Sequence, residues 1–255
     1  MQWDPRQYGR FADERARPFL DLVARIGAAA PRRVVDLGCG SGNLTALLAD
    51  RWPAAHVEGI DSSPEMIAAA PSGERLTFRV GSVEAWTPPP DADVVVSNAT
   101  LQWVPSHRAL LAAWAAALPA DGWLAFQVPG NFGAPSHTVI RALASSPRWA
   151  PSLGEVLRHE DAVAAPSEYA ELLLTAGLEV DAWETSYVHV LPGTDPVLQW
   201  VRGTALRPIM ATLSADEYAE FEGELAPQLR AAYPPTERGT LFPFRRIFVV
   251  AHRPA

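Results

Sequence analysis

The sequence contains no lysine, so all 21 of its basic residues are arginines. Any site for an anion must therefore be built from arginine, histidine, hydroxyl groups or backbone N–H groups. Acidic residues outnumber basic ones by 29 to 21, which gives a formal net charge of -8. A chain with this charge has no overall attraction for nucleic acid or for an anionic membrane surface, and we expect neither as a partner.

Cysteine is nearly absent as well, because Cys39 is the only one in the chain. A single cysteine excludes an intramolecular disulfide and a cysteine metal cluster. Long apolar runs are also lacking: the longest, Ala109–Ala120, is too short to span a bilayer. The polar residues 1–8 do not carry the apolar run of a signal peptide. These features predict a cytoplasmic protein.

Hydrophobic residues make up 48% of the chain and charged residues 20%, which is typical of a globular protein. In the first 130 residues or so, strand-like and helix-like segments alternate. This order predicts a parallel sheet with helices on both faces. The expected strands are 33–37, 56–61, 76–80, 93–98 and 123–128, and the expected helices are 43–51, one starting at Ser62 with Glu65 three residues later, and 105–118.

After Pro129 the alternation stops, and two longer excursions interrupt the sheet pattern. The segments between them predict a helix over 166–176 that ends at Gly177, one or two strands over 178–191, and a last strand over 246–251. Ser214 and Glu217 form a capping-box pattern for a helix that reaches about Ala232. We expect one domain over 1–255, with a core of 20–128, 166–191 and 241–255 and a cap or lid of 1–19, 129–165 and 192–240.

Three glycines, Gly38, Gly40 and Gly42, follow the first strand and open a helix. Such a turn lets the backbone approach a ligand closely, where side chains would collide. Asp61 ends the second strand, where its carboxylate can accept hydrogen bonds from both hydroxyls of an adenosine ribose. Asp36 lies two residues before the first glycine, and a carboxylate there suits an ammonium or sulfonium group better than a pyrophosphate.

The spacing of the glycines is G-x-G-x-G, because position 43 is asparagine. Dinucleotide-binding turns have the spacing G-x-G-x-x-G. Together with Asp36, this difference argues against a nicotinamide-dependent oxidoreductase. Cys39 is interpreted as a small residue that fits the turn.

Residues 34–42 (VVDLGCGSG) and 59–63 (GIDSS) resemble the class I S-adenosylmethionine-dependent methyltransferases. The resemblance implies a Rossmann-like α/β fold: a seven-stranded, mostly parallel sheet with an antiparallel last strand and helices on both faces, to which the two excursions would add a helical cap. It implies S-adenosyl-L-methionine as cofactor and S-adenosyl-L-homocysteine as product. Many members carry an acid at the position of Ser82 or Val83, and this chain does not. The candidate cofactor-binding residues are Tyr8, Asp36, Gly38, Gly40, Asp61, Ser62, Met66, Ser82, Val83, Glu84, Asn98 and Ala99, and Tyr8 with Phe11 could form a lid.

Further stretches, among them 3–8, 97–105 and 242–246, resemble members of this class that methylate a small polycarboxylate. Methyl transfer is an in-line displacement that depends mainly on positioning. A carboxylate is already ionised at neutral pH, so we expect neither a catalytic base nor a metal. His107 and His137 are the histidines expected nearest to a site, although a surface or capping role is favoured for both.

The carboxylates that are not methylated need cationic partners, and arginine can bind a carboxylate through two parallel hydrogen bonds. The candidate substrate-binding residues are Arg202, Arg207, Arg245 and Arg246, with Trp103, Trp200 and Tyr233 as walls that exclude water. Two alternatives stay open. One is another small-molecule or acyl-carrier carboxyl or O-methyltransferase, and the other is a non-catalytic S-adenosylmethionine-binding regulator.

Overall fold

The structure is a computed structural model that describes residues 12–154, 156–157 and 160–255. Its contacts divide the chain into two compact units. The sheet unit comprises 12–128, 164–184 and 247–255, and the helical unit comprises the described residues of 129–163 and 185–246. Strands β6 (Glu179–Leu191) and β8 (Gly239–His252) contribute residues to both units. The predicted division of one domain into core and cap segments stays a prediction.

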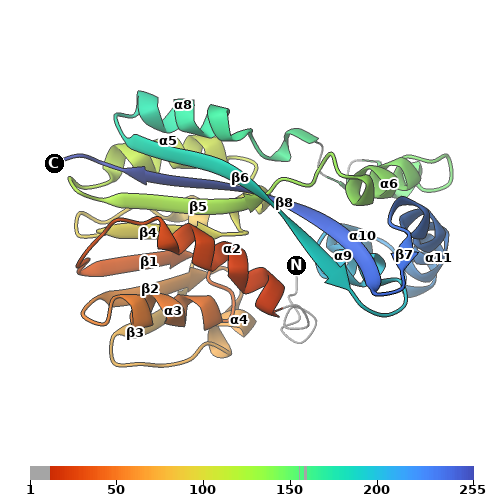
Figure 1. The fold of residues 1–255 in the computed structure, drawn as a ribbon, viewed down its shortest axis with the longest axis horizontal. Coiled ribbons are helices and arrows are strands. Elements are labelled where there is room, and N and C mark those ends of the chain that lie inside the picture. The colour runs from red at the N-terminus through yellow and green to blue at the C-terminus, as the bar shows by residue number, and fades with distance from the viewer. Residues whose placement is uncertain (1–11, 155, 158–159) are drawn as a thin grey trace. The chain divides into compact units, whose positions relative to one another are not determined.

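The sheet has the strand order β3-β2-β1-β4-β5-β8-β6, so seven strands form its path as predicted. The first five strands pair in parallel, and Figure 1 shows β8 running opposite to β5 and β6. A two-residue strand, β7 (Pro235–Thr236), adds an eighth member by pairing with β8. The remaining strands are β1 (Arg33–Leu37), β2 (His56–Asp61), β3 (Leu76–Val80), β4 (Val94–Asn98) and β5 (Trp123–Pro129).

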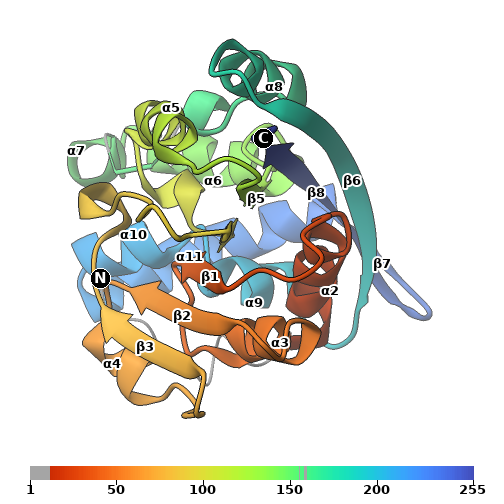
Figure 2. The same ribbon diagram turned by 90° about the vertical axis from the view of Figure 1, so that its left-hand side faces the viewer.

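Helices cover both faces of the sheet unit, as the sequence pattern predicted (Figure 2). Helices α2 (Ala12–Ala24) and α3 (Asn43–Arg51) lie on one face, and α5 (His107–Ala117) packs with α8 (Pro166–Thr175) on the other. The central strands are therefore buried from both sides, which explains why they are continuous apolar runs rather than alternating ones.

Some predicted boundaries were wrong. The helix after β2, α4 (Pro64–Ala68), is capped by Ser63 rather than Ser62, because the Ser63 hydroxyl accepts a hydrogen bond from the Met66 N–H at 3.2 Å. The predicted one or two strands over 178–191 are one long strand, 179–191, so this prediction was not wrong. The last strand begins at Gly239 instead of residue 246. Its added part alternates buried and exposed residues, a pattern of period two that is typical of a strand.

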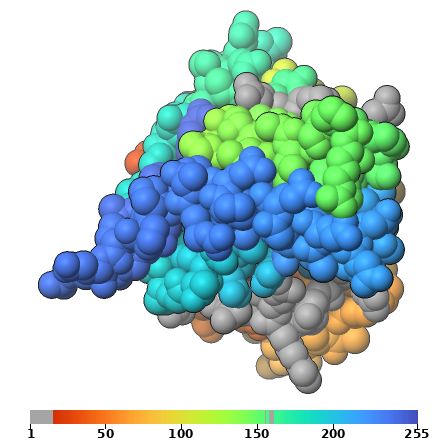
Figure 3. Space-filling view, turned by 90° about the vertical axis from the view of Figure 1, so that its right-hand side faces the viewer, coloured from red at the N-terminus to blue at the C-terminus, as the bar shows by residue number. Residues whose placement is uncertain are grey.

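The helical unit is organised around α11 (Ala215–Ala232), which packs against α6 (Pro135–Ala144), α9 (Pro196–Arg202) and α10 (Arg207–Thr212). Figure 3 shows α11 in blue beside α6 in green. The predicted capping box begins α11: the Glu217 N–H donates to the Ser214 hydroxyl at 3.4 Å, and the Ser214 N–H donates to the Glu217 carboxylate at 2.9 Å. The short α7 (Ala150–Leu153) follows α6. No helix in the described part of the chain is long and apolar enough to cross a membrane.

A buried polar chain links α5 to α8 inside the sheet unit. His107 Nδ1 lies 2.9 Å from the Val104 carbonyl oxygen, so Nδ1 carries the ring proton and Nε2 accepts from the Tyr169 hydroxyl at 2.8 Å. The Tyr169 oxygen in turn accepts from the Ala164 N–H at 3.1 Å. Burial lowers the pKa of His107. The neutral ring satisfies both of its hydrogen bonds, to the Val104 carbonyl and to the Tyr169 hydroxyl. His107 is therefore a structural residue.

We expect Tyr169→Phe to lower the free energy of unfolding by about 1–3 kcal/mol, because His107 Nε2 and the Ala164 N–H lose their partner in a buried place. Thr175→Val is the matched control, since it removes an exposed hydroxyl hydrogen bond on the same helix. Urea unfolding of the two variants measures the difference. Equal stability of both variants would show that the buried chain contributes nothing.

Candidate functional site

The turn between β1 and α3 is held in an unusual backbone conformation. Gly38, Gly40 and Gly42 have φ angles of 76°, 56° and 76°, in the left-handed region that favours glycine. The N–H groups of Gly38 and Cys39 donate to the Ile60 carbonyl at 2.7 and 3.1 Å, which fixes the turn against β2. A Cβ atom at Gly38 would lie 2.0 Å from Thr100 Oγ1.

Gly40 differs from Gly38, because, apart from Gly40 and its two chain neighbours, no described residue has an atom within 4 Å of the place where its Cβ would stand. Its backbone therefore faces open space at the carboxyl end of β1. In parallel α/β sheets, this end of the strands is where ligands bind. The turn thus offers a ligand a bare stretch of backbone, as the glycine spacing predicted.

Asp61 lies at the end of β2 beside this turn. Its Oδ2 accepts from the Gly40 N–H and its Oδ1 accepts from the Ser63 N–H, both at 2.9 Å. Each oxygen retains a lone pair, so the carboxylate can still accept one further hydrogen bond per oxygen. The sequence predicted a ligand role for Asp61, which stays a prediction, and did not predict its structural role in joining the glycine turn to the start of α4.

Asp36 is buried, with 3% of its surface exposed, and accepts a hydrogen bond of 2.6 Å from the Thr45 hydroxyl. Burial is the main cause that raises the pKa of Asp36 to about 7; the Thr45 hydrogen bond opposes this rise, and the nearby charge of Asp61 adds to it. A cation close to Asp36 would favour its ionised form. Burial also raises the pKa of the Cys39 thiol far above its ordinary value, so Cys39 is not a nucleophile at neutral pH.

The chain turns sharply at the end of β4, next to the glycine turn. Ala99 has a φ of 54°, and its N–H donates to the Gln127 carbonyl at 2.9 Å. The Thr100 hydroxyl lies 3.3 Å from the Gly38 carbonyl oxygen and 3.2 Å from that of Asn98. Asn98 Oδ1 is buried without a hydrogen-bond partner among the described residues. The structure thus brings Asn98 and Ala99 to the same place as the glycine turn.

The other cofactor candidates differ in exposure. Val83 is buried in the short helix Val83–Ala85, whereas Ser82 and Glu84 beside it are exposed. Met66 is buried in α4, and Ser62 is exposed. Tyr8 and Phe11 lie outside the described residues. Sequence reasoning missed Thr45, which bonds the Asp36 carboxylate, and Thr100 and Gln102, which bond backbone carbonyls, because isolated polar residues leave no spacing signal.

The arginine candidates belong to the helical unit, and Arg202 already binds a carboxylate there. Its Nε and Nη2 atoms each lie 2.5 Å from an oxygen of Glu222, whose Oε1 also accepts from the Tyr218 hydroxyl at 2.7 Å. Arg207 begins α10 and is half-buried. Arg202 is therefore occupied by an acid of the chain itself.

Arg245 and Arg246 stand on β8. Asn131 fixes the Arg245 backbone, donating to its carbonyl at 2.7 Å and accepting from its N–H at 2.8 Å. The Arg246 side chain is buried, with 6% exposed, and its guanidinium carbon lies 4.6 Å from the centre of the Phe244 ring. A buried guanidinium on an aromatic face is suited to binding an anion.

The aromatic candidates are mostly packed in the core. Trp200 is 1% exposed, and its ring centre lies 5.6 Å from that of Phe242. Tyr233 is also buried, and its hydroxyl accepts from the Ser136 N–H at 3.1 Å. Trp103, in the short helix Leu101–Trp103 of the sheet unit, is half-buried. His137 lies 3.1 Å from the Ser136 hydroxyl in α6.

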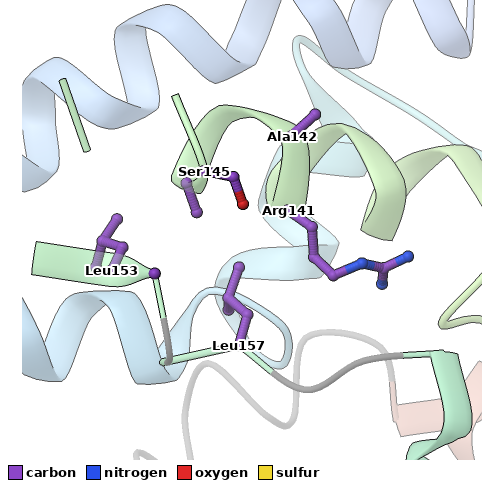
Figure 4. A pocket seen from close by; sticks show the side chains of 7 residues that line it. Arg141, Ala142, Ser145, Leu153 and Leu157 are labelled. Atoms are coloured by element: carbon purple, nitrogen blue, oxygen red, sulfur yellow. The ribbon is translucent and has the colours of Figure 1, made fainter. Parts of the chain in front are cut away.

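A pocket of about 230 Å³ lies in the helical unit between α6 and α7 (Figure 4). It contains none of the predicted site residues, and we assign no function to it. Its lining residues are Arg141, Ala142, Ala144, Ser145, Leu153, Gly154 and Leu157. No group of three or more histidine, cysteine, aspartate or glutamate side chains among the described residues could hold a metal ion.

Comparison with known proteins identifies the family of this chain. Residues 8–182 match the model of a methyltransferase domain family. The trans-aconitate 2-methyltransferase of Rhodococcus jostii is 58% identical over 98% of this chain and 98% of its own. That of Streptomyces avermitilis is 53% identical over 99% and 97%.

Among solved structures, the YcgJ protein of Bacillus subtilis has a TM-score of 0.59 at 18% identity, over 94% of this chain and 99% of its own. At this identity the likeness shows the fold alone. The family match, the two relatives and the geometry of the glycine turn agree. The chain belongs to the class I S-adenosylmethionine-dependent methyltransferases.

Proposed function

We propose that this protein transfers a methyl group from S-adenosyl-L-methionine to a carboxylate of trans-aconitate, giving a monomethyl ester and S-adenosyl-L-homocysteine. The observation that carries the proposal is the similarity to trans-aconitate 2-methyltransferases, which exceeds 50% identity and extends over nearly the whole chain. Its partner is a small anionic polycarboxylate. The cytoplasmic location and the absence of nucleic-acid and membrane partners stay predictions.

The cofactor site that we propose is built from the carboxyl ends of β1, β2 and β4. Gly38 and Gly40 would lie along the methionine part, and Asp61 would accept the two ribose hydroxyls. Asp36 supplies negative charge for a cationic ligand, and Asn98 offers a buried oxygen that has no partner in the described residues. When bound, S-adenosyl-L-methionine supplies an electrophilic methyl group, and the chain has to orient it.

The acceptor needs no activation, because a carboxylate with a pKa near 4 is ionised at neutral pH. This chemistry fits a site without a general base: Cys39 is protonated, and His107 serves a structural hydrogen-bond chain. The protein instead has to hold the carboxylates that do not react. We propose that Arg245 and Arg246 do this, with Arg207 and Arg202 as further candidates and Trp103, Trp200 and Tyr233 excluding water.

The direct test is a screen of small di- and tricarboxylates with a labelled methyl donor. We expect label in an ester of trans-aconitate. The other di- and tricarboxylates of the screen should be methylated more slowly. Transfer to an acyl-carrier protein or a hydroxyl acceptor, and none to trans-aconitate, would favour another methyltransferase of the class. Binding of the cofactor without transfer to any acceptor would favour a regulator.

Asp61→Ala should weaken the binding of S-adenosyl-L-homocysteine at least about tenfold, because two hydrogen bonds to a charged acceptor are lost at about 1.5–3 kcal/mol each. Asp91→Ala is the matched control, since Asp91 is an exposed acid that precedes β4 and pairs with Arg33. Titration calorimetry measures both. Affinity unchanged in the Asp61 variant would remove Asp61 from the cofactor site.

The affinity for S-adenosyl-L-methionine should weaken as the pH falls below about 7. The raised pKa means that Asp36 becomes protonated in the free protein through this range, and the neutral acid attracts a cationic ligand less than the carboxylate does. Asp36→Asn should remove this pH dependence and leave a uniformly weaker affinity. Calorimetry from pH 5.5 to 8.5 tests it, and parallel curves for both proteins would contradict it.

Arg246→Gln should raise the KM for trans-aconitate at least about thirtyfold, because losing one partner of a buried charge pair costs about 2–5 kcal/mol. Arg246→Lys should rescue poorly, since the planar fork is lost. Arg230→Gln is the control: Arg230 Nη1 donates to both oxygens of Asp195 in an exposed ion pair of the same unit. If Gln variants at 202, 207, 245 and 246 all match the parent enzyme, the substrate anions bind elsewhere.

A further inference from the structure

Ala99 has a backbone conformation that L-residues rarely adopt, at φ 54° directly after β4. For a residue with a Cβ atom, this left-handed conformation is sterically unfavourable and persists only where its surroundings hold it. Both polar groups of the Ala99 backbone are held. Its N–H donates to the Gln127 carbonyl at 2.9 Å, and its carbonyl accepts from Gln102 Nε2 at 2.6 Å.

The second of these contacts comes from a side chain, unlike the first. Gln102 is 6% exposed and lies in the short helix that also contains Trp103. That helix is only three residues long, and two i to i−3 backbone bonds hold it, from Trp103 to Thr100 and from Val104 to Leu101. The Gln102 amide therefore links this helix to the turn at Ala99 that precedes it.

The same turn contacts the cofactor candidates on its other side. Thr100 Oγ1 lies 3.3 Å from the Gly38 carbonyl oxygen, and Asn98 precedes Ala99. A change at Ala99 would thus displace Asn98 and Thr100, which adjoin the glycine turn, relative to Trp103, which we assign to the acceptor. An error of about 1 Å in such a placement can cost a hundredfold in rate.

We propose that Gln102 is a positioning residue. It holds Ala99 in its left-handed conformation and so sets the position of Trp103, which we assign to the acceptor, relative to Asn98 and Thr100 beside the glycine turn. The inference rests on the proposed function, and it concerns a residue that neither touches the reacting atoms in our assignment nor carries charge. The side-chain amide acts on the turn through its hydrogen bond to the Ala99 carbonyl.

This role makes a prediction that packing would not make. Gln102→Met keeps the size of the side chain and removes the donor, so Ala99 should leave the left-handed region in part of the molecules. Glycine adopts a positive φ without steric cost. Ala99→Gly should therefore make the turn independent of Gln102, and the effect of Gln102→Met should disappear in the Ala99→Gly background.

The experiment is a double-mutant cycle with the wild type, Gln102→Met, Ala99→Gly and the double variant. It measures kcat and KM with trans-aconitate, the dissociation constant of S-adenosyl-L-homocysteine, and the thermal midpoint. We expect Gln102→Met to lower kcat about tenfold in the wild-type background, from the loss of one hydrogen bond to a buried carbonyl. In the Ala99→Gly background the loss should be less than about twofold. Gln228→Met, which removes an exposed side-chain bond to the Glu224 carbonyl, should change none of these values.

Equal losses of kcat in the two backgrounds would overturn the proposal, because they would mean that Gln102 acts by packing. Unchanged kcat in Gln102→Met alone would overturn it as well. The proposed function fails separately, if the wild type does not methylate trans-aconitate. In that event the affinity for S-adenosyl-L-homocysteine decides the same cycle. This affinity should weaken severalfold in Gln102→Met and be restored by Ala99→Gly. Equal weakening in both backgrounds would reject the proposal.

Discussion

The geometry of the candidate site depends first on the Asp61 carboxylate. One oxygen holds the Gly40 N–H and the other holds the Ser63 N–H, so a single side chain joins the glycine turn after β1 to the helix start after β2. These bonds place the turn without using the whole hydrogen-bonding capacity of the carboxylate. The group that would bind the ribose is thus already oriented by the backbone that would bind the methionine part.

A second constraint is the concentration of negative charge around that turn. Asp36 is buried beside the turn, with Asp61 close enough to raise its pKa. The free protein carries an unfavourable carboxylate there, which a cationic ligand would stabilise. We infer that part of the discrimination between S-adenosyl-L-methionine and its neutral-sulfur product comes from Asp36. The affinity for the cofactor would then depend on the protonation state of Asp36.

The sequence predicted the sheet and the cofactor turn well, because both depend on patterns that are local in the chain. Buried parallel strands are apolar runs such as Val94-Val95-Val96, and left-handed turns favour glycine. It failed where a pattern had no local signature. Ser62 and Ser63 are equivalent caps by composition, and only the bond to Met66 decides between them. Ala99 was a cofactor candidate, but its left-handed conformation and its bond to Gln102 had no sequence signal, since an alanine at positive φ looks like any other alanine.

The sequence could not distinguish between the candidate substrate-binding arginines. Arg202 and Arg246 are both arginines of the helical unit and were equal candidates, yet their surroundings differ in kind. Arg202 forms a close ion pair with Glu222, so an incoming carboxylate would have to displace an acid that is tethered to the chain. The effective concentration of a tethered partner is high, which makes this exchange unfavourable for a free ligand. Arg246 lies buried against the Phe244 ring, where a low dielectric strengthens its attraction for an anion. We therefore expect Arg202 to contribute little to the recognition of the substrate's charge.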